Sequence, residues 1–182
     1  MSPGSIETER LLLRLPQLED ASAFAALYTD PVATEFIGGV HPNAASDPEY
    51  PIRVWLERWH LNGVGPLVAE RREDGVVVGR AGLHVWDVRT WSHTTFDASG
   101  EHAQPELGWA FIREHWGHGY ATEAARAVRE WAYRERDVSR LVSLIAPANV
   151  RSAGVARRLG ASPGETVKLF DASAAVVWEH PG

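Results

Sequence analysis

Two glycines stand at a point of the chain where backbone groups can hold an anion. Gly117 and Gly119 separate an apolar segment, 106–112, from a helical pattern that begins at about Tyr120. Glycines at the start of a helix let the chain curl so that several N–H groups point the same way, and the helix dipole adds to their attraction for a phosphate. A tight turn between a strand and a helix explains the same glycines without a ligand, so the spacing alone leaves both interpretations open.

Other motifs with recognisable chemistry are absent. A dinucleotide-binding fingerprint needs a third glycine where Thr122 stands, and no Gly-Lys-Ser/Thr sequence marks a P-loop. The chain has no cysteine, which excludes disulfides, thiolate zinc sites and cysteine nucleophiles. There is no Gly-x-Ser-x-Gly elbow, and His115 and His118 lack a partner at zinc-binding helical spacing. We therefore expect no metal site.

The charge and hydropathy of the chain limit its partners. Among 182 residues, 18 Lys and Arg stand against 24 Asp and Glu, for a net charge of −6. A protein that neutralises nucleic-acid phosphates normally has the opposite balance. No apolar run is long enough for a membrane span, and the run Leu11–Leu13 is too short for a signal peptide. We expect a cytoplasmic protein that binds neither nucleic acid nor a membrane.

The apolar periodicity predicts the elements that must position these residues. Strands are expected at 10–15, 67–71, 76–86, 106–112, 141–146, 167–170 and 174–178, and helices from about 19, at 48–62, at 120–136 and at 150–159. The polar stretch 87–104 is expected to be a loop. The order predicts one mixed α/β domain over residues 1–182, with antiparallel strands first and a strand-helix-strand-helix unit in the second half.

Turn and capping residues support several of these boundaries. Glu73-Asp74-Gly75 predicts a hairpin turn between two strands. Asp47 is the expected cap of the second helix, with Pro48 at its first position. Asn149 is the expected cap of the last helix, which should end at Gly160 in the left-handed conformation.

Three ordered blocks resemble the GNAT superfamily of N-acetyltransferases, and within it the ribosomal-protein-alanine acetyltransferase-like branch. They are Glu106-Leu-Gly-Trp109, Trp116-Gly-His-Gly-Tyr-Ala-Thr-Glu-Ala124, and Asn149-Val-Arg-Ser152 with Arg158-Leu-Gly-Ala161. The opening Ile6–Arg14 resembles the first strand of that branch, and Asp30-Pro31 with Phe36–Gly39 resembles its first inter-helix segment. The resemblance covers nearly the whole chain. It implies a central, mostly antiparallel sheet that splays at its middle strands and is flanked by helices.

The resemblance also implies an acetyl-CoA site. The pantetheine arm would pair with the backbone at Phe111, Ile112 and Arg113 in the splayed gap. The pyrophosphate would bind the N–H groups of Gly117, His118, Gly119, Tyr120, Ala121 and Thr122. Where the wider superfamily begins this loop with Gln or Arg, Trp116 stands here, which removes one side-chain contact and leaves the backbone cradle.

Two further residues take roles from the same resemblance. Asn149 would reach the pantetheine arm, and Ser152 would lie near the thioester sulfur. The spacing of Asn149 and Ser152 at a helix start adds the prediction that Ser152 protonates the departing thiolate or holds the water that does. Plain helix capping explains both residue types as well. Glu106 is the candidate general base for the acceptor amine, and a glutamate that only attracts a cationic acceptor is the alternative.

The predicted function is acetyl transfer from acetyl-CoA to a primary amine, either a small molecule or a protein N-terminus. A non-catalytic acyl-CoA-binding or regulatory module is the main alternative, and a structural domain with an empty loop is a third. The acceptor site is expected in the variable segments 36–50 and 84–104. Their aromatic and acidic residues suit an apolar or a cationic amine: Trp86, Trp91, Phe96, Asp87, Asp97 and Glu101. A homodimer is an open expectation.

Overall fold

The computed structural model describes residues 4–40, 46–136 and 138–182. Its strands are β1 (Ser5–Glu7), β2 (Leu11–Arg14), β3 (Pro66–Arg71), β4 (Val77–Asp87), β5 (Ser92–His93), β6 (Ala103–Phe111), β7 (Val142–Ile145), β8 (Ser162–Lys168) and β9 (Ala174–Glu179). Its α-helices are α1 (Ala21–Thr29), α2 (Pro31–Thr34), α3 (Tyr50–Asn62), α4 (Phe96–Ser99), α5 (Tyr120–Glu135) and α6 (Val150–Arg158). Short 3₁₀ turns are η1 (Leu18–Asp20), η2 (Gly100–His102) and η3 (Arg113–His115). No helix of the described ranges has both the length and the apolar character to cross a bilayer.

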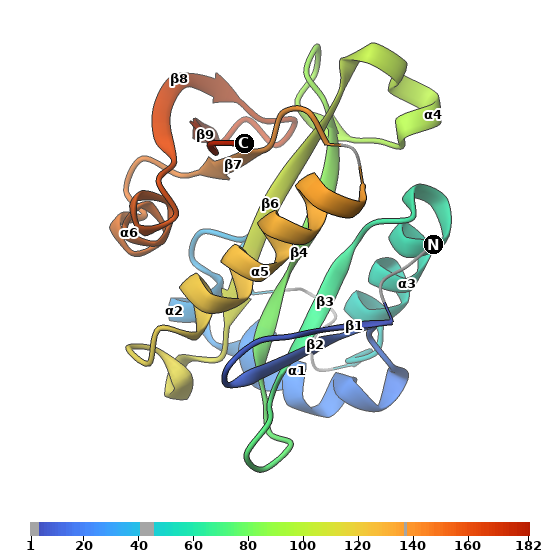
Figure 1. The fold of residues 1–182 in the computed structure, drawn as a ribbon, viewed down its shortest axis with the longest axis vertical. Helices are drawn as coiled ribbons and strands as arrows, with labels where there is room; N and C mark the ends of the chain where they lie inside the picture. Colours follow the sequence, from blue (N-terminus) through green and yellow to red (C-terminus); the bar gives the residue numbers. More distant parts are fainter. Residues whose placement is uncertain (1–3, 41–45, 137) are drawn as a thin grey trace.

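One sheet runs through the molecule in the order β1-β2-β3-β4-β6-β7-β9-β8, with β5 added beside β4. The pairs from β1 to β6 and from β7 to β8 are antiparallel, whereas β6 and β7 are parallel. The parallel pair belongs to the β6-α5-β7 unit, whose helix crosses in front of β4 and β6 in Figure 1. The predicted mixed α/β fold with a mostly antiparallel, splayed sheet is confirmed.

The splay lies between β6 and β7. The two strands register at a single pair, Glu106 with Val142, whereas β4 and β6 register along nine pairs. Just past the single pair, Ser143 Oγ bridges the strands by donating to the Leu107 carbonyl at 2.6 Å. Beyond Leu107 the edge of β6 has no neighbouring strand among the described residues, so its backbone groups are open to a ligand.

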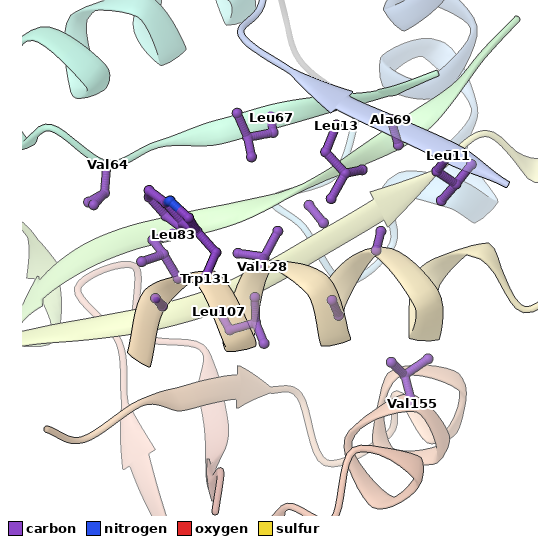
Figure 2. Close-up of a cluster of buried hydrophobic side chains, with 14 of the residues drawn as sticks. Leu11, Leu13, Val64, Leu67, Ala69, Leu83, Leu107, Val128, Trp131 and Val155 are labelled. Atoms are coloured by element: carbon purple, nitrogen blue, oxygen red, sulfur yellow. The ribbon is translucent and has the colours of Figure 1, made fainter. Parts of the chain in front are cut away.

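The core lies on both faces of this sheet. On the face under α5, Val128 and Trp131 pack toward Leu67, Leu83 and Leu107 of the central strands (Figure 2). On the other face a second cluster joins α1 and α3 to the strands, through Phe24, Leu27, Ile52, Trp55, Val68, Ala110 and Ile112. The two clusters hold β6 between α5 and the α1–α3 pair, which fixes the strand that borders the gap.

Several local predictions are confirmed. The turn at Glu73–Gly75 joins β3 to β4, with Gly75 at a φ of +73°. Asn149 caps α6 by accepting the Ser152 N–H at 3.0 Å, and Gly160 follows that helix at a φ of +79°. The expected central strands, β9 and the long helix α5 also form close to their predicted bounds.

The predicted first strand, 10–15, forms as β2 (Leu11–Arg14), and a short strand that was not predicted, β1, pairs with it. In the turn between them the Leu11 N–H donates to Thr8 Oγ1 at 2.8 Å. The predicted start of the second helix is wrong. The second helix begins at Tyr50 instead of Pro48. Asp47 does not cap it, because the Asp47 carboxylate pairs with Arg53.

Two further boundaries differ from the prediction. The expected loop 87–104 contains β5, which pairs with β4, and the short helix α4, capped by Thr95. The expected strand 167–170 overlaps only the end of a longer strand, β8, which stops at Lys168. Most of β8 is exposed, so it carries no apolar alternation by which it could be predicted.

Candidate active site

A cavity of about 520 Å³ lies between the open edge of β6, the start of α5 and the start of α6. The predicted cofactor residues Phe111, Gly117, Gly119, Tyr120, Ala121, Thr122, Asn149 and Ser152 line it. The remaining three, Ile112, Arg113 and His118, are not among its lining residues. The cavity therefore gathers residues from three separate sequence blocks into one place.

The loop before α5 presents a row of backbone N–H groups. Gly117 and Gly119 have φ values of +82° and +83°, in the left-handed region that favours glycine. The Thr122 N–H already donates to the Gly119 carbonyl at 3.1 Å. From Gly117 to Ala121 no acceptor among the described residues takes the N–H groups. These groups lie at the positive end of α5, a geometry that suits an anion.

Side chains brace this loop from both sides. Trp116 Nε1 donates to the Phe111 carbonyl at 2.7 Å, which ties the loop to the end of β6. Arg10 donates to the His118 carbonyl at 2.9 Å and pairs with Glu123 of α5 at 2.6 Å. Trp116 thus holds the loop in place through its ring nitrogen.

Two cations from α6 line the same cavity. Arg158 Nε donates to Thr122 Oγ1 at 3.1 Å, so its guanidinium lies beside the first turn of α5. The Arg151 guanidinium stacks on the Trp116 ring at 4.5 Å from its centroid. Both positive charges reinforce the attraction of the loop for a phosphate.

The edge of β6 exposes alternate backbone groups to the gap. The Ile112 N–H donates to the Val78 carbonyl of β4 at 3.0 Å, so the backbone groups of Ile112 point toward β4. Along a strand in an antiparallel pair, the backbone N–H and C=O groups of successive residues point to opposite sides. The backbone groups of Trp109 and Phe111 therefore point away from β4, into the gap between β6 and β7. Two predicted cofactor residues that do not line the cavity have side-chain partners elsewhere. The Arg113 guanidinium lies 3.9 Å from the Asp30 carboxylate, and His118 Nδ1 donates to the Trp116 carbonyl. Their side chains are thus engaged outside the cavity.

A second cavity, of about 570 Å³, lies on the α1–α3 side of the sheet. It meets the first cavity at residues that line both: Phe36, Ile37, Trp109, Asn149 and Ser152. The Ser152 N–H is in the cap of α6, but its hydroxyl has no partner among the described residues. Ser152 Oγ is therefore available where the two cavities join.

Glu106 is a buried carboxylate in the wall of the second cavity, with 8% of its surface exposed. Its Oε2 accepts the Trp86 indole N–H at 2.9 Å. Burial raises the pKa of Glu106, and the bonds from Trp86 and the Leu144 N–H, with the charges of Arg80 and Arg58, oppose this only partly. A carboxylate with a raised pKa is a stronger base than one in water once it is ionised.

The sequence of the chain matches a known protein family over most of its length. Residues 10–162 match the acetyltransferase (GNAT) domain. The chain belongs to the GNAT acetyltransferase family. It is an acyltransferase, in a family that uses acetyl-CoA as its acyl donor.

Individual relatives agree with this assignment. The crystal structure of an acetyltransferase from Agrobacterium tumefaciens str. C58 is 28% identical, with a TM-score of 0.80 over 100% of this chain and 96% of that chain. The uncharacterised protein YkkB of Bacillus subtilis (strain 168) is 29% identical over 174 residues, 93% of this chain and 91% of YkkB. The structure of AAC(6')-Ib with ribostamycin and coenzyme A has a TM-score of 0.73 over 94% of this chain and 93% of that chain; at 18% identity, it shows the shared fold.

The GNAT site also contains residues that the sequence analysis did not select. Arg58, Arg80 and His84 line the second cavity beside Glu106. Arg80 and His84 alternate with apolar residues along β4. Polar residues at these positions of an otherwise apolar strand were the sequence signal that could have identified them as site residues. The expected acidic residues Asp87, Asp97 and Glu101 are not among the lining residues, and Asp87 is paired with Arg89. In the described ranges, no cluster of His, Asp and Glu fits a metal ion.

Proposed function

We propose that this acetyltransferase moves the acetyl group of acetyl-CoA to a primary amine, of a small molecule or a protein N-terminus. The observation that carries the proposal is the junction of two cavities, one beside a backbone anion cradle and the other beside a buried carboxylate. A donor in the first and an acceptor in the second meet at Ser152 and Asn149. A non-catalytic acyl-CoA-binding module would need no such second cavity.

The first cavity suits the chemistry of coenzyme A. The N–H groups from Gly117 to Ala121 would bind the pyrophosphate, with Arg151 and Arg158 adding positive charge. The open backbone groups of Trp109 would pair with the amides of the pantetheine arm as an added strand does, since the Phe111 carbonyl already accepts the Trp116 indole N–H. This pairing replaces the predicted use of Ile112, whose N–H is bound to β4.

The reaction needs one proton removed and one supplied. The neutral amine attacks the thioester carbonyl, a C–N bond forms and the C–S bond breaks. Glu106 takes the proton that the amine loses, directly or through a water, and Ser152 Oγ gives one to the departing thiolate. The Phe111 N–H, which points into the gap, stabilises the oxyanion that forms on the carbonyl.

Ligand-induced stabilisation and turnover test this function separately. Acetyl-CoA at about 100 times its Kd should stabilise the fold by about 2.7 kcal/mol, read as a rise in Tm. Release of free CoA thiol should then depend on added primary amine. Stabilisation without thiol release over a broad amine panel would favour the non-catalytic module, and no stabilisation would exclude both.

Gly119→Ala is expected to weaken acetyl-CoA binding about tenfold, or about 1.4 kcal/mol, in a titration of the folded protein. At a φ of +83°, a Cβ forces the cradle to change shape, although its surroundings offer space. Gly160→Ala is the matched control, because Gly160 has a φ of +79° at the far end of α6. Both variants should lose similar thermal stability, and only the first should lose affinity. Equal affinities in the two variants would contradict the cradle.

A further inference from the structure

The second cavity, in which we place the acceptor, contains two guanidinium groups that form no ion pair in the described part of the chain. Arg80 is 8% exposed and Arg58 is partly buried, and both line the cavity. Neither forms an ion pair with a carboxylate in the described part of the chain, although Glu106 attracts both electrostatically. Charges removed from water are normally paired, because an unpaired buried ion is strongly destabilising.

The surrounding side chains hold both guanidiniums without neutralising them. Arg80 Nε donates to Tyr28 Oη at 3.2 Å, and its guanidinium lies over the Trp55 ring at 5.5 Å. His84 lies between the two arginines, with Nδ1 against Arg58 and Nε2 3.4 Å from Arg80. Burial and the two positive charges keep His84 neutral by lowering its pKa. A neutral imidazole accepts at one nitrogen only, so it satisfies one of the two guanidiniums.

The ionisable groups around the cavity leave an excess of positive charge. Glu106 and Asp171 are its carboxylates among the described lining residues. Asp171 is exposed and accepts bonds from Ser173, and Glu106 is committed to Trp86 and the Leu144 N–H. Two guanidiniums therefore face one buried carboxylate. This excess disfavours a purely cationic acceptor and favours one that carries its own anion.

We propose that the acceptor is a small amine that also carries a carboxylate, and that Arg58 and Arg80 bind this carboxylate. The inference rests on the proposed acetyl transfer and specifies its substrate class. The planar guanidinium matches a carboxylate with paired N–H donors, and fixing this end of the molecule directs the amine toward Glu106 and Ser152. Aromatic walls from Trp55, Trp86 and Phe170 suit an apolar body between the two ends. Amino acids of moderate size have this combination.

Binding of product-like ligands tests the anion site without turnover. The probes are N-acetyl-L-phenylalanine, N-acetyl-L-leucine and N-acetyl-L-alanine, each against its primary amide, titrated into the CoA-loaded protein. At least one acid should bind about thirtyfold or more tightly than its amide, the usual loss when a buried charge loses its partner. If every acid binds no better than its amide, the proposal is overturned.

Variants of Arg58 and Arg80 test whether these two residues cause the preference for the acid over its amide. Arg80→Met and Arg58→Met should each lower the affinity for the acid nearly to the affinity for its amide, while acetyl-CoA still binds. Arg80→Lys should recover part of the preference if the Met variant folds poorly. Arg126→Met, at an exposed position on α5, is the matched control and should leave the preference unchanged. A preference that persists in both Met variants would place the anion elsewhere.

Acceptor turnover separates this inference from the function on which it rests. The free amino acids phenylalanine and leucine should exceed their amides and decarboxylated amines in kcat/KM. The matching aminophosphonic acids show whether another anion serves in place of the carboxylate. Faster acetylation of amides, or of peptides with the same first residue, would overturn the inference and leave acetyl transfer intact. Acid-selective binding with no acetylation would support the anion site and contradict the proposed function.

Discussion

Glu106→Gln is expected to lower kcat at pH 7 about a hundredfold, within the ~10²–10⁴-fold range of general acid–base catalysis. Glutamine keeps the shape of the side chain and an oxygen for the Trp86 indole N–H, but it cannot take a proton. An amine acceptor is largely protonated at neutral pH, since the reference pKa is about 8 for an α-amine and ~10.4 for a lysine-type amine. Turnover without a base is limited to the small fraction of free amine.

The activity of the wild type and of Glu106→Gln should depend on pH in different ways. Burial raises the pKa of Glu106, so in the wild type its carboxylate forms only above the ordinary range of a glutamate. Activity should therefore rise with pH as Glu106 ionises. In Glu106→Gln this rise should be replaced by one that follows the free amine, so the variant regains activity toward high pH. His84 is a poor substitute as a base, because burial and the neighbouring charges of Arg58 and Arg80 lower its pKa.

The alternative role of Glu106 predicts a different kinetic pattern. If Glu106 only attracts the acceptor, Glu106→Gln should raise the KM for the amine and leave kcat nearly unchanged at every pH. Glu130→Gln, at an exposed position of α5, removes one negative charge far from the second cavity and is the matched control. A KM effect alone would remove Glu106 from the catalytic residues.

The glycine loop proposed as an anion cradle could be predicted from sequence because it is local. Gly117, Gly119 and the helix that follows lie within a few residues of one another, and positive φ values are a property of the glycines themselves. Asn149 is equally local, since its side chain caps the helix that it begins. Short-range backbone geometry therefore gave both the candidate loop and the candidate cap.

The acceptor cavity could not be predicted in the same way, because strand pairing assembles it. His84 and Glu106 lie opposite each other only because β4 and β6 pair in one register, and Arg58 reaches them from α3. A shift of one residue would place these polar groups on the opposite face. The acidic residues of the segment 84–104 suggested a cationic acceptor, but the fold turns Asp87 toward Arg89 and brings the arginines inward. The acidic residues of the segment 84–104 therefore did not predict the charge inside the cavity.

Ser152→Ala is expected to lower kcat about a hundredfold with little change in acetyl-CoA affinity, because only the hydroxyl that protonates the thiolate is removed. Helix capping does not explain a loss of this kind. The cap of α6 uses the Ser152 backbone N–H and the Asn149 side chain, and both remain in the variant. The loss should shrink toward high pH, since a thiol with a reference pKa of about 8.5 leaves more readily as the thiolate there.

Stability measurements complete this test. Asn149→Ala removes the cap and should cost about 1 kcal/mol of folding stability, whereas Ser152→Ala should keep the wild-type Tm. Thermal melts and single-turnover acetylation of one amine acceptor, run on the same preparations, compare the two variants directly. A Ser152→Ala protein that melts early and turns over at the wild-type rate would make Ser152 a structural residue. In that case the thiolate would take its proton from solvent at the junction of the two cavities.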